Sequence, residues 1–306
     1  MIASTLSSPI PAFLTLLLLL AGCTEVEGDA ASPPPVADDA RVVLVTGSTG
    51  GLGREVAIAL GAEGAHVIVH GRNEDRGREV VEEIRSGGTG SAVFHAADLA
   101  SFEDVRAFAE QLLEDYDRID VLVNNAGIWL DGPNERQLSE DGHELHLQVN
   151  YLSGYLLTHL LLPLLEPSTD ARIVNVASAA QRPMDFDDPM MDEDYSHGRG
   201  YGQSKLAQIT FTMDLARELS ERGITVTALH PATFMDTDMV LSRGAEPRAT
   251  VQEGAEAVLQ LVNAPGIESG SYYNGLSEAR ANDQAYDPEA QEALRRLSRE
   301  LTGVPE

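Results

Sequence analysis

The 306-residue sequence contains a single cysteine, Cys23. One thiol excludes an internal disulfide bond and any metal site built from several thiolates. Histidine is sparse as well: among eight residues, His143 and His146 stand three apart, and nothing nearby in the sequence completes a zinc site. We therefore expect no metal cofactor, and we interpret both histidines as ordinary helix residues.

Basic and aromatic residues are also few. Lysine and arginine together number 21 against 49 aspartates and glutamates, which gives a formal net charge of −28, and aromatics make up 5% of the chain. A protein with this negative charge repels phosphate backbones, and its few aromatic residues offer little surface on which bases could stack. Nucleic-acid binding is therefore not expected. The acidity fits ordinary solubility and adaptation to high salt equally well.

The chain lacks a hydrophobic run long enough to span a bilayer, which needs roughly 20 apolar residues. The run at residues 12–20 is shorter and favours the apolar region of a signal peptide. It leads into Leu-Ala-Gly-Cys23, which resembles a bacterial lipoprotein cleavage box, although no lysine or arginine precedes Arg41.

We therefore predict a lipoprotein-like signal peptide at 1–22, a flexible tether at 23–40 and one folded domain at 41–306. The tether prediction rests on its content of proline, alanine and acidic residues. The predicted location is the cell envelope, with a membrane tether through Cys23. The alternative is a cytoplasmic protein whose start codon has been misassigned.

Strand-like and helix-like segments alternate from Arg41 onward. Apolar segments typical of strands lie at 42–45, 66–70, 91–95, 119–123, 172–176, 224–229 and 271–273, with helical patterns between them, for example at 54–63 and 201–222. Continuous Val/Ile/Leu runs are typical of parallel strands that are buried on both faces. The pattern predicts an α/β fold with a single doubly wound parallel sheet, a Rossmann-type three-layer α/β/α domain.

A glycine-rich turn follows the first predicted strand. Residues 46–53 read Thr-Gly-Ser-Thr-Gly-Gly-Leu-Gly, and a helical pattern begins directly afterwards. Glycines let the backbone approach a pyrophosphate, and a helix N-terminus offers unpaired N–H groups to it. We interpret the turn as a dinucleotide-binding loop.

The second predicted strand ends with His70-Gly71-Arg72. Enzymes that use NAD usually carry an acidic residue there for the ribose 2′-hydroxyl. Here Gly71 stands in that place, and the guanidinium of Arg72 would pair well with a 2′-phosphate. This favours NADP(H), with NAD as the alternative.

Tyr201 and Lys205 stand four residues apart in a helical pattern, so their side chains share one helix face. A nearby ammonium favours the phenolate and is expected to lower the pKa of Tyr201 from its usual value near 10. Hydride transfer to a carbonyl leaves an alkoxide that needs a proton, which a phenol can donate. The pair predicts acid/base chemistry.

Together these motifs resemble the short-chain dehydrogenase/reductase family. The resemblance rests on the spacing Thr-Gly-x-x-x-Gly-x-Gly, on Asn-Asn-Ala-Gly at 124–127, on a strand that ends at Ser178 and on Tyr-x-x-x-Lys, and it covers nearly the whole domain. The stretches at 149–158 and 201–207 resemble the retinol-dehydrogenase-like branch.

The resemblance implies a catalytic tetrad in which Ser178 bonds the substrate oxygen, Tyr201 is the acid/base, and Asn150 holds a water linked to Lys205. It also implies a carboxylate of Asp98 near the adenine ring. The implied cofactor-binding residues are Thr46, Gly47, Ser48, Gly51, Leu52, Gly53, Arg72, Asp98, Leu99, Asn125, Ala126, Gly127, Tyr201, Lys205, Pro231 and Thr233.

One motif departs from the family pattern: Pro231 is followed by Ala232 where the family usually has glycine, so the loop beside the nicotinamide is expected to differ. We expect Thr233 or Thr237 to contact the carboxamide there.

The substrate mouth is predicted at 184–197 and 234–241, of which the first segment holds six acidic residues. Apolar side chains in these segments point to a lipophilic carbonyl or alcohol; they are Met184, Phe186, Met190, Met191, Phe234 and Met235.

The sequence therefore predicts an oxidoreductase that moves hydride between NADP(H) and a carbonyl or alcohol. One alternative is a sugar-nucleotide epimerase or dehydratase, although the glycine spacing differs. Another is a membrane-tethered dinucleotide sensor without turnover, because an exported enzyme would lack free cofactor. Relatives often associate through the helices that carry Asn150 and Tyr201, which implies a dimer or tetramer.

Overall fold

The computed structural model describes residues 1–2, 36–37 and 39–305. The predicted signal peptide, Cys23 and most of the tether lie outside the described residues. No helix in the described part is long and apolar enough to cross a membrane.

The folded region is built on one eight-stranded sheet with the order β3-β2-β1-β4-β5-β6-β7-β8. Seven strands are parallel, and β8 is antiparallel to β7. The strands are β1 (Val42–Val45), β2 (His66–Gly71), β3 (Ser91–Ala96), β4 (Val121–Asn124), β5 (Ala171–Val176), β6 (Ile224–His230), β7 (Tyr272–Asn274) and β8 (Ser277–Ala279). The predicted α/β fold and doubly wound sheet are confirmed.

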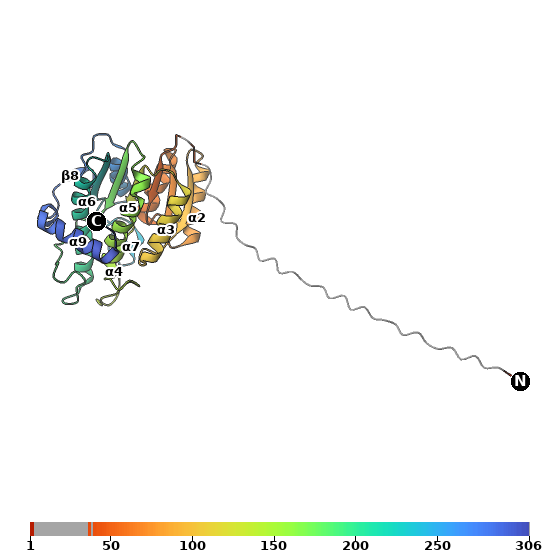
Figure 1. Ribbon diagram of the computed structural model, residues 1–306, viewed down its shortest axis with the longest axis horizontal. Helices are drawn as coiled ribbons and strands as arrows, with labels where there is room; N and C mark the ends of the chain where they lie inside the picture. Colours follow the sequence, from red (N-terminus) through yellow and green to blue (C-terminus); the bar gives the residue numbers. More distant parts are fainter. Residues whose placement is uncertain (3–35, 38, 306) are drawn as a thin grey trace. The chain divides into compact units, whose positions relative to one another are not determined.

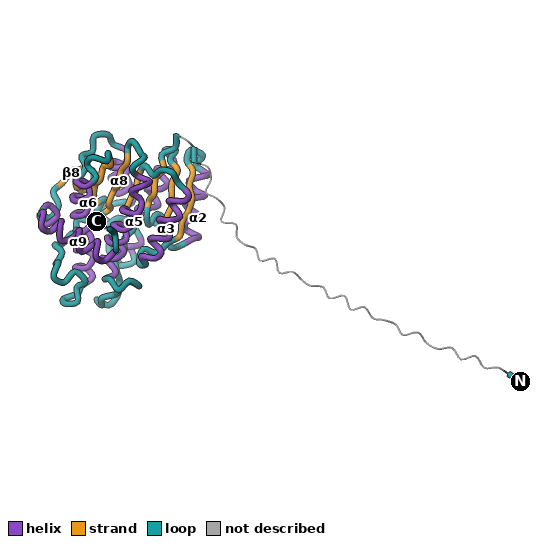
Figure 2. The backbone as a smooth tube through the Cα atoms, in the orientation of Figure 1, coloured by secondary structure: helices purple, strands orange, loops and turns teal. Residues whose placement is uncertain are grey.

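Helices cover both faces of the sheet (Figures 1 and 2). They are α1 (Gly51–Ala62), α2 (Glu74–Ser86), α3 (Phe102–Asp115), α4 (Leu145–Leu147), η1 (Gln148–Leu152), α5 (Ser153–Leu165), α6 (His197–Glu218), α7 (Asp238–Leu241), α8 (Val251–Asn263), η2 (Asp283–Tyr286) and α9 (Pro288–Thr302).

The two layers follow from the alternation of side chains along each strand. In β1, Val43 and Val45 pack with α1, α2 and α8, whereas Leu44 between them packs with α3, α5 and α6. Both faces of the strands are apolar, so each carries its own core. This is why the strand segments read as continuous hydrophobic runs in the sequence.

Side-chain caps fix where the main helices begin. Ser101 caps α3, Ser196 caps α6, and Thr250 forms a capping box with Glu253 at the start of α8. Each cap satisfies backbone N–H groups that would otherwise lack a partner. The helix predicted at 201–222 therefore begins earlier, at His197, which places Tyr201 in its second turn.

Candidate active site

A cavity of about 700 Å³ opens at the carboxyl ends of the parallel strands. Gly47, Asn125, Ala177 and His230, which follow or end β1, β4, β5 and β6, all line it. In open α/β sheets ligands bind at this edge. Most of the residues predicted for the site line the cavity: Gly47, Gly51, Leu52, Gly53, Arg72, Asp98, Leu99, Asn125, Ala126, Gly127, Ser178, Tyr201, Lys205, Pro231 and Thr233.

The glycine turn is a cradle that side chains would fill. Gly47 has φ +65°, and a Cβ there would stand 2.8 Å from Ala126 Cα. A Cβ on Gly53 would stand 2.4 Å from both Asn125 Nδ2 and Gly47 O. Only glycine permits this close approach of β1, α1 and the segment after β4. The turn thus brings the backbone of its glycines to the cavity, as a pyrophosphate group requires.

Thr46 and Ser48 were predicted to bind cofactor, but the structure places their side chains behind the turn. Thr46 is buried, and its Oγ1 accepts hydrogen bonds from the N–H groups of Asn125 and Ala126, each at 3.0 Å. Ser48 is fully buried and donates to Val45 O at 2.7 Å. Neither lines the cavity, so both shape the turn from within.

His70 also holds the turn, a role that was not predicted from the sequence. The Gly47 N–H donates to His70 Nδ1 at 3.2 Å, and the imidazole stacks on Phe108. Burial lowers the pKa of His70 to about 4, so the ring is neutral at physiological pH and its Nδ1 can accept.

Arg72 and Asp98 lie together at one part of the cavity, with 3.6 Å between Arg72 Nη1 and Asp98 Oδ2. Both side chains are substantially exposed. Gly71 packs so tightly that a Cβ there would stand 2.6 Å from Thr49 Cγ2. An acidic side chain at position 71 would therefore require Thr49 to move.

Ser178 and Tyr201 meet inside the cavity. Burial raises the pKa of Tyr201, while a hydrogen bond with Ser178 and the positive charge of Arg243 act to lower it. The Tyr201 ring also packs against Trp129, with 4.8 Å between ring centroids. The phenol is therefore protonated at neutral pH and is held beside a second hydroxyl.

Lys205 behaves differently from the prediction. Its Nζ donates to Val176 O and Gln208 Oε1, both at 2.8 Å, and lies 5.8 Å from the Tyr201 ring centroid. Burial without a carboxylate partner lowers the pKa of Lys205 to about 7. The prediction that this ammonium lowers the pKa of Tyr201 is therefore wrong for the protein without cofactor, in which burial dominates.

Asn150 lies behind the cavity wall, in the π-helical turn η1. Its Oδ1 accepts from Ile128 N at 2.7 Å, and its Nδ2 donates to Ser204 Oγ at 3.0 Å. A Cβ on Gly127 would stand 3.3 Å from Asn150 Oδ1 and 3.4 Å from Lys205 Nζ. Asn150 Oδ1 and Lys205 Nζ thus both lie next to Gly127. Ser178, Tyr201 and Lys205 line the cavity, and Asn150 does not.

A family model described as short chain dehydrogenase matches residues 41–248. The chain belongs to the short-chain dehydrogenase family.

Human retinol dehydrogenase 12 is 35% identical over 277 residues, covering 86% of this chain and 87% of that protein. Human retinol dehydrogenase 14 is 34% identical over 294 residues with the same coverage. Among solved structures, a short-chain dehydrogenase from Salmonella enterica superposes with a TM-score of 0.65 at 26% identity, covering 78% of this chain and 96% of that one. A protein from Shigella flexneri, described as a short-chain dehydrogenase complexed with NADP, gives 0.65 at 25% identity, covering 79% and 98%.

Membership confirms the predicted class of activity: this short-chain dehydrogenase is an oxidoreductase that moves hydride between NAD(P) and an alcohol or carbonyl group. It does not favour the epimerase or the sensor. The glycine cradle and the cavity that continues from it to Tyr201 fit such a dinucleotide.

The dehydrogenase also has a buried polar cluster behind Tyr201. Of the two histidines interpreted as ordinary helix residues, His146 lies in α4 but belongs to this cluster, and His143 precedes the helix. His146 and Glu144 are fully buried, and His146 Nδ1 bonds Glu144 Oε1 at 2.7 Å. The Leu130 N–H donates to His146 Nε2 at 3.2 Å, which leaves Nδ1 to donate to Glu144. The cluster fastens the Trp129 segment next to Tyr201.

The predicted substrate mouth is only half right. Phe234 and Met235 line the cavity, together with α7. Four other apolar residues predicted for its wall instead pack into the protein: Met184, Phe186, Met190 and Met191. In the loop after β6, Ala232 avoids positive φ, and Phe234 adopts φ +51° instead. The positive φ in this loop therefore lies two residues after the alanine that stands in place of glycine.

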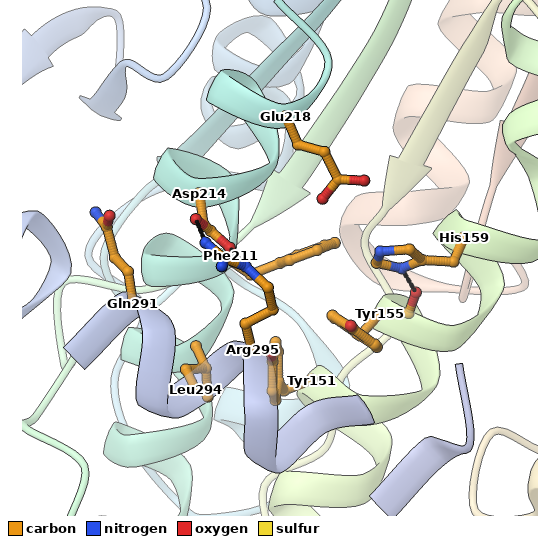
Figure 3. Close-up of a pocket in the computed structure, with 9 residues that line it drawn as sticks. All are labelled: Tyr151, Tyr155, His159, Phe211, Asp214, Glu218, Gln291, Leu294 and Arg295. Atoms are coloured by element: carbon orange, nitrogen blue, oxygen red, sulfur yellow. Dashed lines mark hydrogen bonds and ion pairs between the residues drawn. The ribbon is translucent and has the colours of Figure 1, made fainter. Parts of the chain in front are cut away.

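A second, much smaller cavity of about 10 Å³ lies where α5, α6 and α9 meet (Figure 3). There Arg295 Nε of α9 donates to Asp214 Oδ2 of α6 at 2.8 Å. This space holds about one water molecule and no substrate. It lies in the interface through which α9 packs against α6, the helix that carries Tyr201 and Lys205.

Proposed function

We propose that this short-chain dehydrogenase interconverts lipophilic carbonyl compounds and alcohols with NADP(H), using Tyr201 as its acid/base. One observation carries the proposal: the Tyr201 phenol, Ser178 and Lys205 line the same cavity as the glycine cradle. Nicotinamide cofactor, when bound, supplies or accepts the hydride.

The side chains then divide the work at the substrate oxygen. Ser178 donates a hydrogen bond to it and so favours the negative charge that develops there. In reduction, Tyr201 gives its proton to the nascent alkoxide; in oxidation, its phenolate takes the proton from the alcohol. Lys205, held by Val176 O and Gln208, keeps a titratable amine behind the phenol.

The preference for NADP(H) rests on Arg72 and Gly71. The side chain of Arg72 is 68% exposed and ends beside Asp98 at the cavity, where it is free to swing onto a 2′-phosphate. Gly71 packs against Thr49, so the acidic side chain that an NAD enzyme uses would fit at position 71 only if Thr49 moved. The Shigella flexneri protein named above is complexed with NADP.

We expect Arg72→Gln to weaken NADPH binding about tenfold or more and to leave NADH nearly unchanged, because only NADPH carries the 2′-phosphate. The measurement is kcat/KM with both cofactors across a panel of carbonyl compounds. Arg78→Gln is the matched control, since Arg78 also lies near the start of α2 but pairs with Glu74 and Asp75 away from the cavity. If Arg72→Gln leaves the ratio of kcat/KM with NADPH to kcat/KM with NADH unchanged, the assignment of Arg72 to the 2′-phosphate is contradicted.

The lipophilic substrate is supported by the apolar side of the cavity, where Leu145, Val149 and Val240 accompany Trp129. It is supported also by the relatives, which are named retinol dehydrogenases. The panel should therefore favour aromatic and long-chain aldehydes over small polar ones. Equal or better turnover of small polar carbonyls would count against it.

We also propose that Cys23 is lipidated and tethers the enzyme to the cell envelope, as the apolar run and the cleavage-box pattern support. Mass spectrometry of the mature N-terminus tests this: a diacylated Cys23 is expected, and an unprocessed Met1 would contradict it. Association into a dimer or tetramer stays a prediction. The helix α9 packs on α6 and η1, so it covers part of the surface on which that prediction relied.

A further inference from the structure

Arg243 is an arginine in the wall of the catalytic cavity that the proposed reaction does not use. It follows α7 and lies with its guanidinium carbon 4.0 Å from the centroid of the Trp129 ring. The same Trp129 packs against Tyr201. One indole therefore bridges the acid/base and a positive charge.

The Arg243 guanidinium has hydrogen-bonding capacity to spare. Its nearest acidic partner is Asp131, with 4.0 Å between Arg243 Nε and Asp131 Oδ1, at the limit of an ion pair. No acceptor in the described part of the chain takes a hydrogen bond from this side chain. A guanidinium presents five N–H donors in a fork that matches a carboxylate. Arg72, the other arginine in the cavity wall, lies beside Asp98 and is assigned above to the 2′-phosphate of the cofactor.

The charge of the whole chain makes this placement informative. At −28, the protein repels anions in general. A cation at the substrate end of the cavity offsets this locally and would let a small anion approach Tyr201.

We propose that Arg243 binds an anionic group of the substrate, so that the enzyme acts on carbonyl compounds or alcohols that carry a carboxylate. The inference rests on the proposed function and narrows its substrate class. Because Tyr201 and Arg243 both contact the Trp129 indole, we expect a short spacer, such as one aromatic ring, between the reacting oxygen and the carboxylate. The apolar wall takes the spacer, and Arg243 takes the charge.

The test uses 4-formylbenzoate and its uncharged methyl ester, which differ only at the group that Arg243 would bind. Trp129 is the only tryptophan, so tryptophan fluorescence reports on this site alone. With saturating NADP⁺ an aldehyde cannot be reduced, so a titration measures binding without turnover. We expect the acid to bind the full chain at least tenfold more tightly than the ester.

Arg243→Gln should weaken binding of the acid roughly ten- to a hundredfold, the usual effect of losing a hydrogen-bonded charge, and change the ester less than twofold. Arg248→Gln is the matched control: it removes the same charge from the same loop, stacked on Phe234, at a residue that does not line the cavity. It should leave both affinities unchanged.

Three results would overturn the inference: equal binding of acid and ester, equal weakening of both by Arg243→Gln, or an equal effect of Arg248→Gln on the acid. Equal binding of acid and ester would show that no anion is recognised. Equal weakening of both by Arg243→Gln would show that Arg243 only packs on Trp129. An equal effect of Arg248→Gln would show that the affinity for the acid depends on the overall charge of the loop and not on Arg243. Turnover with NADPH is measured separately. If the enzyme reduces the ester but does not bind the acid more tightly, the proposed function stands and this inference fails. If it binds the acid selectively but reduces neither compound, this inference stands and the proposed function fails.

Discussion

At the scale of single residues, burial decides the electrostatics of the site. Lys205 is buried and Tyr201 is half-buried, and desolvation favours the neutral form of each. Lys205 is also the only lysine in the chain. The protein thus places its one primary side-chain amine where it is costly to charge, next to a phenol that keeps its proton.

This placement predicts how stability depends on pH. The folded pKa of Lys205, about 7, lies below its ordinary value of 10.5, so between these values the unfolded chain binds the additional proton. As the pH rises from 7 to 9, this group should therefore increase the free energy of unfolding by about 1.4 kcal/mol per pH unit. Denaturant unfolding of the cofactor-free protein at both pH values measures it.

Lys205→Met is the comparison, because it removes the titrating group and keeps an apolar stem of similar length. The difference in unfolding free energy between wild type and variant should grow in favour of wild type as the pH rises. A difference that does not vary with pH would mean that Lys205 is charged in the folded protein.

At the scale of elements, the junction of β1, α1 and the segment after β4 controls cofactor binding. We expect Gly53→Ala to displace the turn, because its Cβ would stand 2.4 Å from Gly47 O, and to reduce cofactor affinity strongly. Gly198→Ala in the first turn of α6 is the control, because a Cβ there meets nothing within 4 Å. It should stabilise the protein by up to about 1 kcal/mol. Cofactor titration and thermal unfolding of both variants check this; equal cofactor affinity in the two would refute the role of the turn.

The sequence predicted elements better than it predicted contacts between them. Hydrophobic runs located seven strands to within a few residues, because each run is a local consequence of burial on both faces. The glycine turn and the pair Tyr201 and Lys205 were found because their spacing along the chain is itself the signal, whereas Ser178 was implied by the family resemblance. The short antiparallel β8 and the π-helical turn η1 were not predicted, since neither has a periodicity of its own.

Roles that depend on distant partners could not be read from the sequence. His70 acts on Gly47, and His146 acts on Leu130, only after folding brings those segments together. Arg243 becomes significant through Trp129, more than 100 residues away in the chain. The apolar character of Met184 and Met191 was correctly seen, but whether an apolar side chain faces a cavity or the core is settled by tertiary packing.

At the scale of the whole molecule, the net charge of −28 leaves a choice between solubility and adaptation to high salt. Dispersed like charges destabilise the compact state, and salt screens them. We expect the melting temperature to rise by several degrees between 0.05 and 2 M NaCl if the surface is adapted to salt. A melting temperature that stays constant, or falls, across this range would favour the solubility interpretation.

The central claim, that the Tyr201 phenol transfers the proton in the reaction, is tested most directly by Tyr201→Phe. The change removes one oxygen atom and keeps the ring against Trp129. With NADPH and the best aldehyde of the panel, we predict that kcat falls at least a hundredfold while the affinity for NADPH stays within about threefold. Turnover at the wild-type rate in a variant that binds NADPH normally would contradict the account.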